Sequence, residues 1–314
     1  MTTSPVLLLV FNRPATTRRV LEALRVARPP RLLVVADGPR SEHPDDERLC
    51  EETRALFDDP GWPCEVTTEF SSVNLGCRMR CISGLDWAFA REDRAIVLED
   101  DCVPHPTFVP FCSELLERYR DDERVHMIRG TNFLRGRRLS RDSYYSSRFC
   151  NIWGWATWAR AWRHYDGEMR RWPQMRDNAW LESYLPSPAM AKLARYFFEE
   201  TYAGRLDAWD YQWVFAGWLR NAHCLVPATN LVTNIGFGID ATHTRDAEPG
   251  LDDLPLQPIA FPLRHPRDVH VNEAADRLEW ELMFPALAAE DSIVQRLAAR
   301  MGLRWRPSHK ASKS

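Results

Sequence analysis

The sequence lacks the excess of basic residues with which proteins hold nucleic acid. Its 41 Lys and Arg residues are balanced by 44 Asp and Glu residues, which leaves a formal net charge of -3 over 314 residues. We therefore expect no broad basic surface and no nucleic-acid partner. The 45% hydrophobic and 27% charged residues are typical of a globular protein that buries a full core, in one large domain or two small ones.

Long apolar runs are also missing. No window reaches the ~18 apolar residues of a membrane span, and the first strand begins without the basic and apolar regions of a secretion signal. We therefore expect a cytoplasmic protein. The basic C-terminal tail, RWRPSHKASKS, is typical of solvent-exposed chain. A weak contact with a membrane surface, peripheral at the inner membrane face, is the alternative that its charge allows.

The eight cysteines do not form a metal-binding pattern. Cys77 and Cys81 are spaced i, i+4 on a predicted helix, but no second His or Cys pair completes a zinc set. Because no secretion signal is present, the thiols are expected to stay reduced. We predict that both cysteines are core or half-buried thiols.

No familiar glycine-rich phosphate loop is present. The chain has no G-x-x-x-x-G-K-[ST] loop and no G-x-G-x-x-G in the expected place, so kinase-like and dinucleotide-binding functions have weak support. The segment SSVNLGCRMRC instead places Asn74, Gly76 and Arg78 between a strand and a helix start. A glycine there lets the backbone approach a ligand, and Arg78 near a helix N-terminus can reach a diphosphate.

Strands alternate with helices over residues 1–130. The predicted strands are PVLLLVFNRP, RLLVVADGP, CEVTTEF, AIVLEDD and VHMIRG, and the predicted helices start at Pro14 and cover about 45–57, 77–89 and 107–120. This order predicts an α/β fold with a mostly parallel sheet and helices on both faces. We assign residues 1–130 to a nucleotide-binding half.

Residues 131–245 form a second, aromatic half, in which most of the 13 tryptophans lie between positions 153 and 218. Aromatic rings stack on sugars, but tryptophans more often pack in cores, so we assign one or two to sugar binding and the rest to packing. A helix is predicted over 189–202. Residues 246–314 are assigned to an irregular Pro-rich linker, a helical extension and the basic tail.

Three consecutive carboxylates, Glu99, Asp100 and Asp101, follow the predicted strand AIVL. Crowded carboxylates repel one another and need a cation between them, and a divalent metal that carries a diphosphate is the usual candidate. A solvated turn or a helix cap is the alternative. Because α/β sheets bind ligands at the carboxyl ends of their strands, we favour a metal and nucleotide-sugar site.

The two preceding buried strands end in polar residues of the same kind. The first ends at Asn12 and Arg13, and the second at Asp37. In a parallel sheet these ends form one edge, where an aspartate can accept from a base or ribose and an arginine can bind a phosphate. A turn aspartate and a solvent-exposed arginine remain the alternative.

The motifs FNR, ADG, NLGC, LEDD, GW, WDYQW, NIGFG and ATHT, in this order, resemble those of the GT-A glycosyltransferases. Within that class they are similar to bacterial sugar transferases related to N-acetylglucosaminyltransferase I. The resemblance spans about 5–245, and LEDDCVPHPTF is its most specific part. It implies a GT-A fold with a C-terminal helical extension, and transfer of a hexosyl or N-acetylhexosaminyl group in polysaccharide biosynthesis. The donor would be a nucleoside diphosphate sugar, with a UDP-sugar favoured, and the acceptor a saccharide or glycoconjugate.

The resemblance also implies roles for single residues. Asp101 would bind Mn²⁺ (or Mg²⁺), with Glu99 and Asp100 positioning the donor sugar and ribose. The nucleotide site would be lined by Arg13, Asp37, Asn74 and Arg78, with Asp37 at the base. Trp155, in IWGWATW, would pack under the donor and acceptor sugars.

Asp210, in AWDYQW, matches the general base of the related inverting enzymes, although Tyr211 stands where they have a second aspartate. A helix residue paired with a cation such as Arg205 is the alternative for Asp210. His243 is a candidate second metal ligand. The competing functions are a sugar-phosphate nucleotidylyltransferase, which the glycine-free FNRPATTRR disfavours, and a non-catalytic binding or cytolytic protein.

Overall fold

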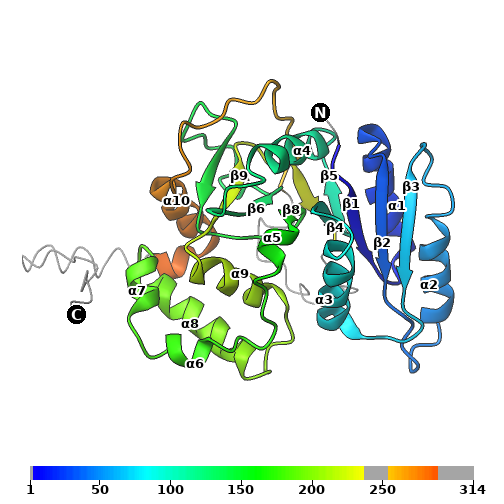
Figure 1. Ribbon diagram of the computed structural model, residues 1–314, viewed down its shortest axis with the longest axis horizontal. Helices are drawn as coiled ribbons and strands as arrows, with labels where there is room; N and C mark the ends of the chain where they lie inside the picture. Colours follow the sequence, from blue (N-terminus) through cyan, green and yellow to red (C-terminus); the bar gives the residue numbers. More distant parts are fainter. Residues whose placement is uncertain (1–2, 237–253, 289–314) are drawn as a thin grey trace, which may run out of the picture.

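The computed structural model describes residues 3–236 and 254–288. A single eight-stranded sheet runs through the molecule, with helices packed around it (Figure 1). In spatial order its strands are β3 (Glu65–Phe70), β2 (Arg31–Ala36), β1 (Val6–Val10), β4 (Arg94–Glu99), β8 (Trp155–Trp158), β6 (Val125–Arg129), β9 (His223–Pro227) and β7 (Tyr144–Ser147).

The first four strands of this order are parallel, and the remainder of the sheet is mixed. β8 runs antiparallel to both β4 and β6, whereas β6 and β9 are parallel and β7 is antiparallel to β9. The carboxyl ends of β1, β4, β6 and β9 therefore lie at one edge of the sheet. The predicted α/β class with a mostly parallel sheet is confirmed.

β1 is completely buried because helices cover both faces of the sheet. Leu8 and its neighbours on one face belong to a core that includes α1 (Pro14–Ala27) and α4 (Phe108–Arg118). Leu7 and Leu9 belong to a second core with α3 (Gly76–Phe89) on the other face. Pro14 stands at the start of α1, where its missing N–H costs nothing.

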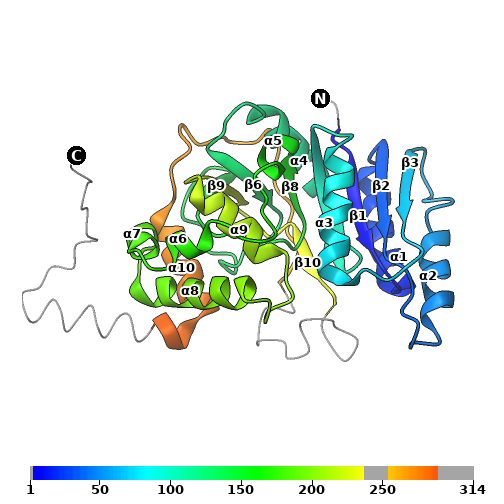
Figure 2. The same ribbon diagram turned by 60° about the horizontal axis from the view of Figure 1, so that its bottom comes forward.

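The aromatic half adds a lobe of helices beside the sheet (Figure 2). The helices of this lobe are α6 (Trp172–Met175), α7 (Trp180–Tyr184), α8 (Pro188–Tyr202) and α9 (Asp210–Leu219). The short helix α5 (Ala159–Trp162) follows β8 and packs instead in the second core. A third core, which includes Trp172, Phe198 and Trp218, holds this lobe together. The helix predicted over 189–202 is confirmed as α8.

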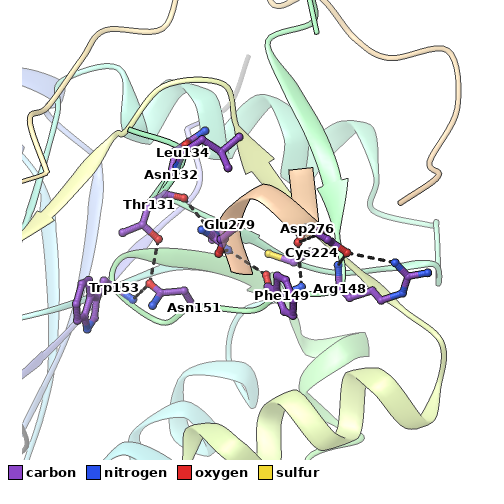
Figure 3. Close-up of polar contacts among 12 residues, drawn as sticks. Thr131, Asn132, Leu134, Arg148, Phe149, Asn151, Trp153, Cys224, Asp276 and Glu279 are labelled. Carbon is purple, nitrogen blue, oxygen red and sulfur yellow. Dashed lines mark hydrogen bonds and ion pairs between the residues drawn. The ribbon is translucent and has the colours of Figure 1, made fainter. Parts of the chain in front are cut away.

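α10 (Glu273–Met283) lies within the predicted extension and packs against the sheet region. Asp276 accepts hydrogen bonds from Ser147 Oγ at 2.6 Å and from the Arg148 backbone N–H at 3.3 Å. Glu279 accepts from Nη1 of the buried Arg129 at 2.8 Å. Figure 3 shows both α10 carboxylates pointing toward the segment that carries Arg148 and Phe149. The described part of the extension is thus tied to the sheet by buried charges.

Three smaller elements complete the described chain. α2 (Asp46–Ala55) follows β2, and β5 (Cys102–Pro104) pairs antiparallel with β10 (Val232–Asn234). Residues 254–267, the described part of the predicted Pro-rich linker, contain no helix or strand, while residues 289–314, which include the basic tail, lie outside the described residues. None of the helices in the described ranges is long and apolar enough to cross a membrane.

The cysteine prediction is only half correct. None of the eight cysteines, all of which lie in the described ranges, forms a disulfide, and Cys81 is buried, but Cys77 is exposed. The reason is its place in the first turn of α3, beside the exposed Leu75 and Met79, rather than on the face that packs against the sheet.

Candidate functional site

A cleft of about 970 Å³ opens where the strand order changes direction between β2, β1 and β4. Such a point leaves a crevice outside the carboxyl ends of the strands, because successive connections depart to opposite sides. The cleft is lined by the β1–α1 turn, the ends of β2 and β4, the start of α3, and Ile235 and Gly236. The predicted rim residues Arg13, Asp37 and Asn74 lie around this one cleft.

Arg13 lies between two of the three consecutive carboxylates. Its Nε donates to Asp100 Oδ2 at 3.2 Å, its Nη2 donates to Asp100 Oδ1, and the same nitrogen is 3.0 Å from Asp101 Oδ2. The crowding that suggested a metal from the sequence is therefore relieved here by a guanidinium. Arg13 was predicted to line the nucleotide site, and its direct partners in the structure are these carboxylates.

Burial dominates the chemistry of the acidic residues. The Asp100 side chain is only 3% exposed, and this burial raises its pKa to about 6, although Arg13 acts to lower it. Burial also raises the pKa of Glu99 well above its ordinary value, and the charge of Asp101 adds to the increase. Glu99 Oε1 is buried and has no hydrogen-bond partner within residues 3–236 and 254–288. A polar atom left this way is expected to meet a donor, a water or a ligand.

Asp37 holds the start of α3. Its two carboxylate oxygens accept from the backbone N–H groups of Leu75 at 2.9 Å and Gly76 at 3.0 Å, and from Asn74 Nδ2 at 3.1 Å. The Gly38 N–H also donates to Asp37, at 2.9 Å. The structure thus gives Asp37 and Asn74 a joint role in fixing the β3–α3 loop, and the predicted contact of Asp37 with a base stays a prediction.

Arg78 and Trp155 lie outside the lining of the cleft. Arg78 Nη2 donates to the Gly167 carbonyl at 3.0 Å, which links α3 to the loop before α6. Trp155 has no exposed surface and packs against Trp209 and Trp213, with ring centroids 5.8 and 5.7 Å away. Its position in the structure is that of a core side chain, so a sugar could contact it only after its covering residues move.

Asp210 is the first residue of α9. α9 precedes β9 in the chain. The charges of Glu99 and Asp210 both raise the pKa of Cys81, after a hydrogen bond with Cys77 and burial, and Cys81 lines the cleft. Arg205, the alternative partner for Asp210, pairs with Glu200 at 2.7 Å.

The donor set at the acidic end is small. Within residues 3–236 and 254–288, no three His, Cys, Asp or Glu side chains are grouped so as to hold a metal ion. Among the described residues, the Asp101 carboxylate accepts a 3.4 Å hydrogen bond from Asn234 Nδ2 in addition to its contacts with Arg13 and the Cys102 thiol. One carboxylate suits a metal that reaches the protein with phosphate and water ligands. His243 lies outside the described residues.

Two further parts of the cleft were not identified from the sequence. Asp46 is buried and binds both Asn12 and Arg40, which come from different loops. Gly236 lies so close to Asp101 that a Cβ there would be 2.1 Å from its Oδ2. In the sequence, Asp46 belongs to the Asp45–Asp46 pair, which indicates a helix start but not a role in the cleft. Gly236 belongs to the NIGFG motif, but its contact depends on the pairing of β10 with β5.

No family model matches the sequence, and no curated protein matches it. Among solved structures, the chain is similar to a UDP-glucose pyrophosphorylase complexed with UDP-glucose, at 11% identity and a TM-score of 0.27 over 46% of this chain and 62% of that one. It is also similar to an apo UDP-glucose pyrophosphorylase, at 8% identity and a TM-score of 0.34 over 71% and 90% of the two chains.

A third similar structure is the apo form of the glycosyltransferase GlyE from Streptococcus pneumoniae TIGR4. The identity is 10% and the TM-score is 0.26, over 99% of this chain and 66% of that one. This chain thus spans less than two thirds of the first and third of these structures. At these scores the likenesses carry no argument about function, so the cleft itself must supply it.

Proposed function

We propose that this chain is a GT-A glycosyltransferase that moves a sugar from a nucleoside diphosphate sugar to a hydroxyl of a saccharide or glycoconjugate. One observation carries the proposal: the cleft at the change of strand order is lined by Arg13, Glu99 and Asp100, and Asp101 pairs with the same arginine. A ligand of this cleft would meet backbone and polar groups on one side and carboxylates on the other. A diphosphate with its cation fits that combination of charges.

In this proposal Asp101 would hold Mn²⁺ or Mg²⁺, which would offset the charge that builds on the leaving diphosphate. Arg13 would exchange part of its contact with Asp100 and Asp101 for the phosphate oxygens, because a guanidinium can serve both kinds of anion. Glu99, whose Oε1 has no hydrogen-bond partner in the described part of the chain, would donate or accept a hydrogen bond at the donor sugar or ribose.

Asp210 would act as the general base. An acceptor hydroxyl must lose its proton as it attacks the anomeric carbon, and a positioned carboxylate assists such a transfer by ~10²- to 10⁴-fold. Attack from the side opposite the diphosphate would invert the anomeric centre. The proton would move from the acceptor oxygen to a carboxylate oxygen of Asp210, and the electron pair of the broken bond would leave with the diphosphate.

The test is binding of UDP, GDP, CDP and dTDP, each with and without Mn²⁺, measured by thermal shift. We expect one nucleotide, UDP in the first instance, to stabilise the native chain only with the metal; a ligand at 100 times its Kd adds about 2.7 kcal/mol. Asp101→Asn should lose this effect. Asp121→Asn, at a carboxylate whose side chain is 86% exposed, is the matched control. No shift with any nucleotide contradicts the proposal.

The reaction products then distinguish between the competing enzyme functions. A glycosyltransferase releases a nucleoside diphosphate from a nucleotide sugar, whereas a nucleotidylyltransferase joins a nucleoside triphosphate and a sugar phosphate and releases pyrophosphate. Chromatography of both reaction mixtures distinguishes these outcomes. Binding without either product would favour the non-catalytic alternative, and loss of turnover with retained nucleotide binding in Asp210→Asn would support the base role.

A further inference from the structure

Two adjacent residues of the β1–α1 turn point to opposite parts of the cleft. Arg13 reaches the carboxylates after β4, whereas Asn12 Nδ2 donates to Asp46 Oδ1 at 2.7 Å, at the start of α2. α2 follows β2, on the other side of β1 from β4. The turn therefore divides the cleft into an acidic end, lined by Glu99 and Asp100 and adjacent to Asp101, and a second end beside Asp46.

Asp46 organises this second end. It is 2% exposed, and its Oδ2 accepts from Arg40 Nε at 2.6 Å and from the Arg40 backbone N–H at 3.1 Å. Its Oδ1 accepts from Arg40 Nη2 at 3.0 Å in addition to Asn12. Asp46 thus forms a two-pronged pair with Arg40, a geometry that fixes the plane of the guanidinium.

The groups that Asp46 holds present a surface suited to a planar heterocycle. The Arg40 guanidinium lies 5.4 Å from the centroid of the Phe11 ring, and its side chain is 38% exposed. The bond from Asn12 Nδ2 turns the carboxamide oxygen away from Asp46. Phe11, Asn12, Arg40 and the apolar Leu49 all line the cleft. A flat aromatic and cationic surface with a fixed amide beside it can stack and hydrogen-bond a nucleobase.

The alternative base contact is already occupied. The Asp37 carboxylate accepts from the backbone of Gly38, Leu75 and Gly76 and from the Asn74 amide. A nucleobase would have to displace one of these donors to reach it. Asn12 and Arg40 require no such exchange.

We propose, resting on the proposed function, that Phe11, Asn12 and Arg40 form the nucleobase subsite of the donor and that Asp46 is the positioning residue that fixes Asn12 and Arg40. The diphosphate then lies toward Arg13 and Asp101, at the other end of the cleft. Asp46 touches Asn12 and Arg40 and acts through them. Base selectivity therefore depends on Asp46, whereas the affinity that comes from the diphosphate does not.

The experiment measures Kd by calorimetry for UDP, GDP, CDP and dTDP with Mn²⁺, on the native chain and on Asp46→Asn. We expect the native chain to bind its preferred nucleotide at least about tenfold more tightly than the poorest. Asp46→Asn should reduce this ratio at least about threefold while the Kd of the poorest nucleotide changes little, because both oxygens of a carboxylate accept and one amide group donates. Asp45→Asn, at a neighbouring side chain that is 75% exposed, should keep the native ratio.

Arg40→Met provides a second variant if Asp46→Asn does not fold, since Arg40 is partly exposed. It should lower the same ratio. An unchanged ratio in a folded variant, an equal loss for all four nucleotides, or a native chain that binds all four alike would each overturn the inference. If the native chain binds none of them, the proposed function fails first, so the two failures are distinguishable.

Discussion

Arg13 is the countercharge of a buried carboxylate. Asp100 is 3% exposed and has Arg13 as its ion-pair partner, while the Phe11 N–H donates to it at 3.4 Å. A carboxylate so enclosed is stable as an anion only while the guanidinium is beside it, since desolvation favours its neutral form. Arg13 therefore contributes to the stability of the fold, and a ligand that binds Arg13 must compete with Asp100 for it.

Replacement of Arg13 by Met is expected to destabilise the protein. Breaking a buried ion pair costs ~3–5 kcal/mol because it leaves an uncompensated charge. Because the Arg13 side chain is 27% exposed, we expect a loss of stability at the lower end of this range. Urea unfolding measures the change. Arg18→Met, on the exposed side of α1, is the control and should change stability by less than about 0.5 kcal/mol. Equal midpoints for both variants would show that Asp100 is satisfied without Arg13.

Gly236 leaves room for the Asp101 carboxylate. A Cβ at this position would lie 2.1 Å from Asp101 Oδ2, so Gly236→Ala must displace one of the two. We expect the variant to lose most Mn²⁺-dependent nucleotide binding in calorimetry while its melting temperature stays within a few degrees. Gly167→Ala is the control, because its added Cβ meets nothing closer than 3.5 Å. If Gly236→Ala binds nucleotide and Mn²⁺ with native affinity, Asp101 does not contribute to the binding site.

Among the secondary-structure elements, the buried strands of the sheet could be predicted most directly from the sequence. β1, β2 and β4 are covered on both faces, so their sequences are continuous apolar runs that the sequence alone identifies. β7 and β8 are four residues each, YYSS and WATW, and their hydroxyl and aromatic side chains resemble those of a loop. Their place in the sheet depends on distant partners in β9, β4 and β6.

The residues of the candidate site also differ in whether the sequence alone could place them. Residues at strand ends, such as Arg13 and Asp37, could be placed at one edge because parallel strands end together. The link from Asn12 to Asp46 could not, since it depends on how the loops after β1 and β2 meet. The burial of Trp155 also depends on α9, whose Trp213 packs on it.

α10 supplies the countercharge of Arg129, which is fully buried at the end of β6. We expect Glu279→Gln to cost ~3–5 kcal/mol, because Arg129 keeps its bonds to the carbonyls of Thr131 and Phe149 but loses its anion. Glu281→Gln, at an exposed position of the same helix, should be close to neutral. Urea unfolding of both variants tests the difference, and a neutral Glu279→Gln would mean that α10 is a dispensable attachment.

For the whole molecule, buried titratable groups set the response to acid. Burial lowers the pKa of His126 to about 3, and its ring stacks on Trp213 with centroids 3.7 Å apart. Burial raises the pKa of Asp276 to about 6. The unfolded chain binds a proton at histidine near its ordinary value of about 6.5, so His126 favours unfolding as the pH falls below that value. Asp276 acts in the opposite direction between about 6 and its ordinary value near 4.

Between pH 6 and pH 4, His126 should contribute a loss of up to about 1.4 kcal/mol of stability per pH unit, which the raised pKa values of Asp276 and Asp100 oppose. His126→Gln should remove this contribution, so that its stability falls less, or rises more, than that of the native chain as the pH is lowered, although the variant is less stable at neutral pH. Unfolding free energies at several pH values provide the measurement. His43→Gln, on the surface, should follow the native curve. Parallel curves for all three proteins would refute a role for His126.

α9 carries Asp210 and belongs to two cores. Trp213 packs in the core beneath the sheet, whereas Phe215 and Trp218 pack in the core of the helical lobe. A tilt of this helix would unpack both cores at once, so its orientation is set mechanically from two sides. The backbone position of the proposed base is therefore fixed. An acceptor hydroxyl must reach Asp210 through movement of the acceptor itself and of the surrounding loops.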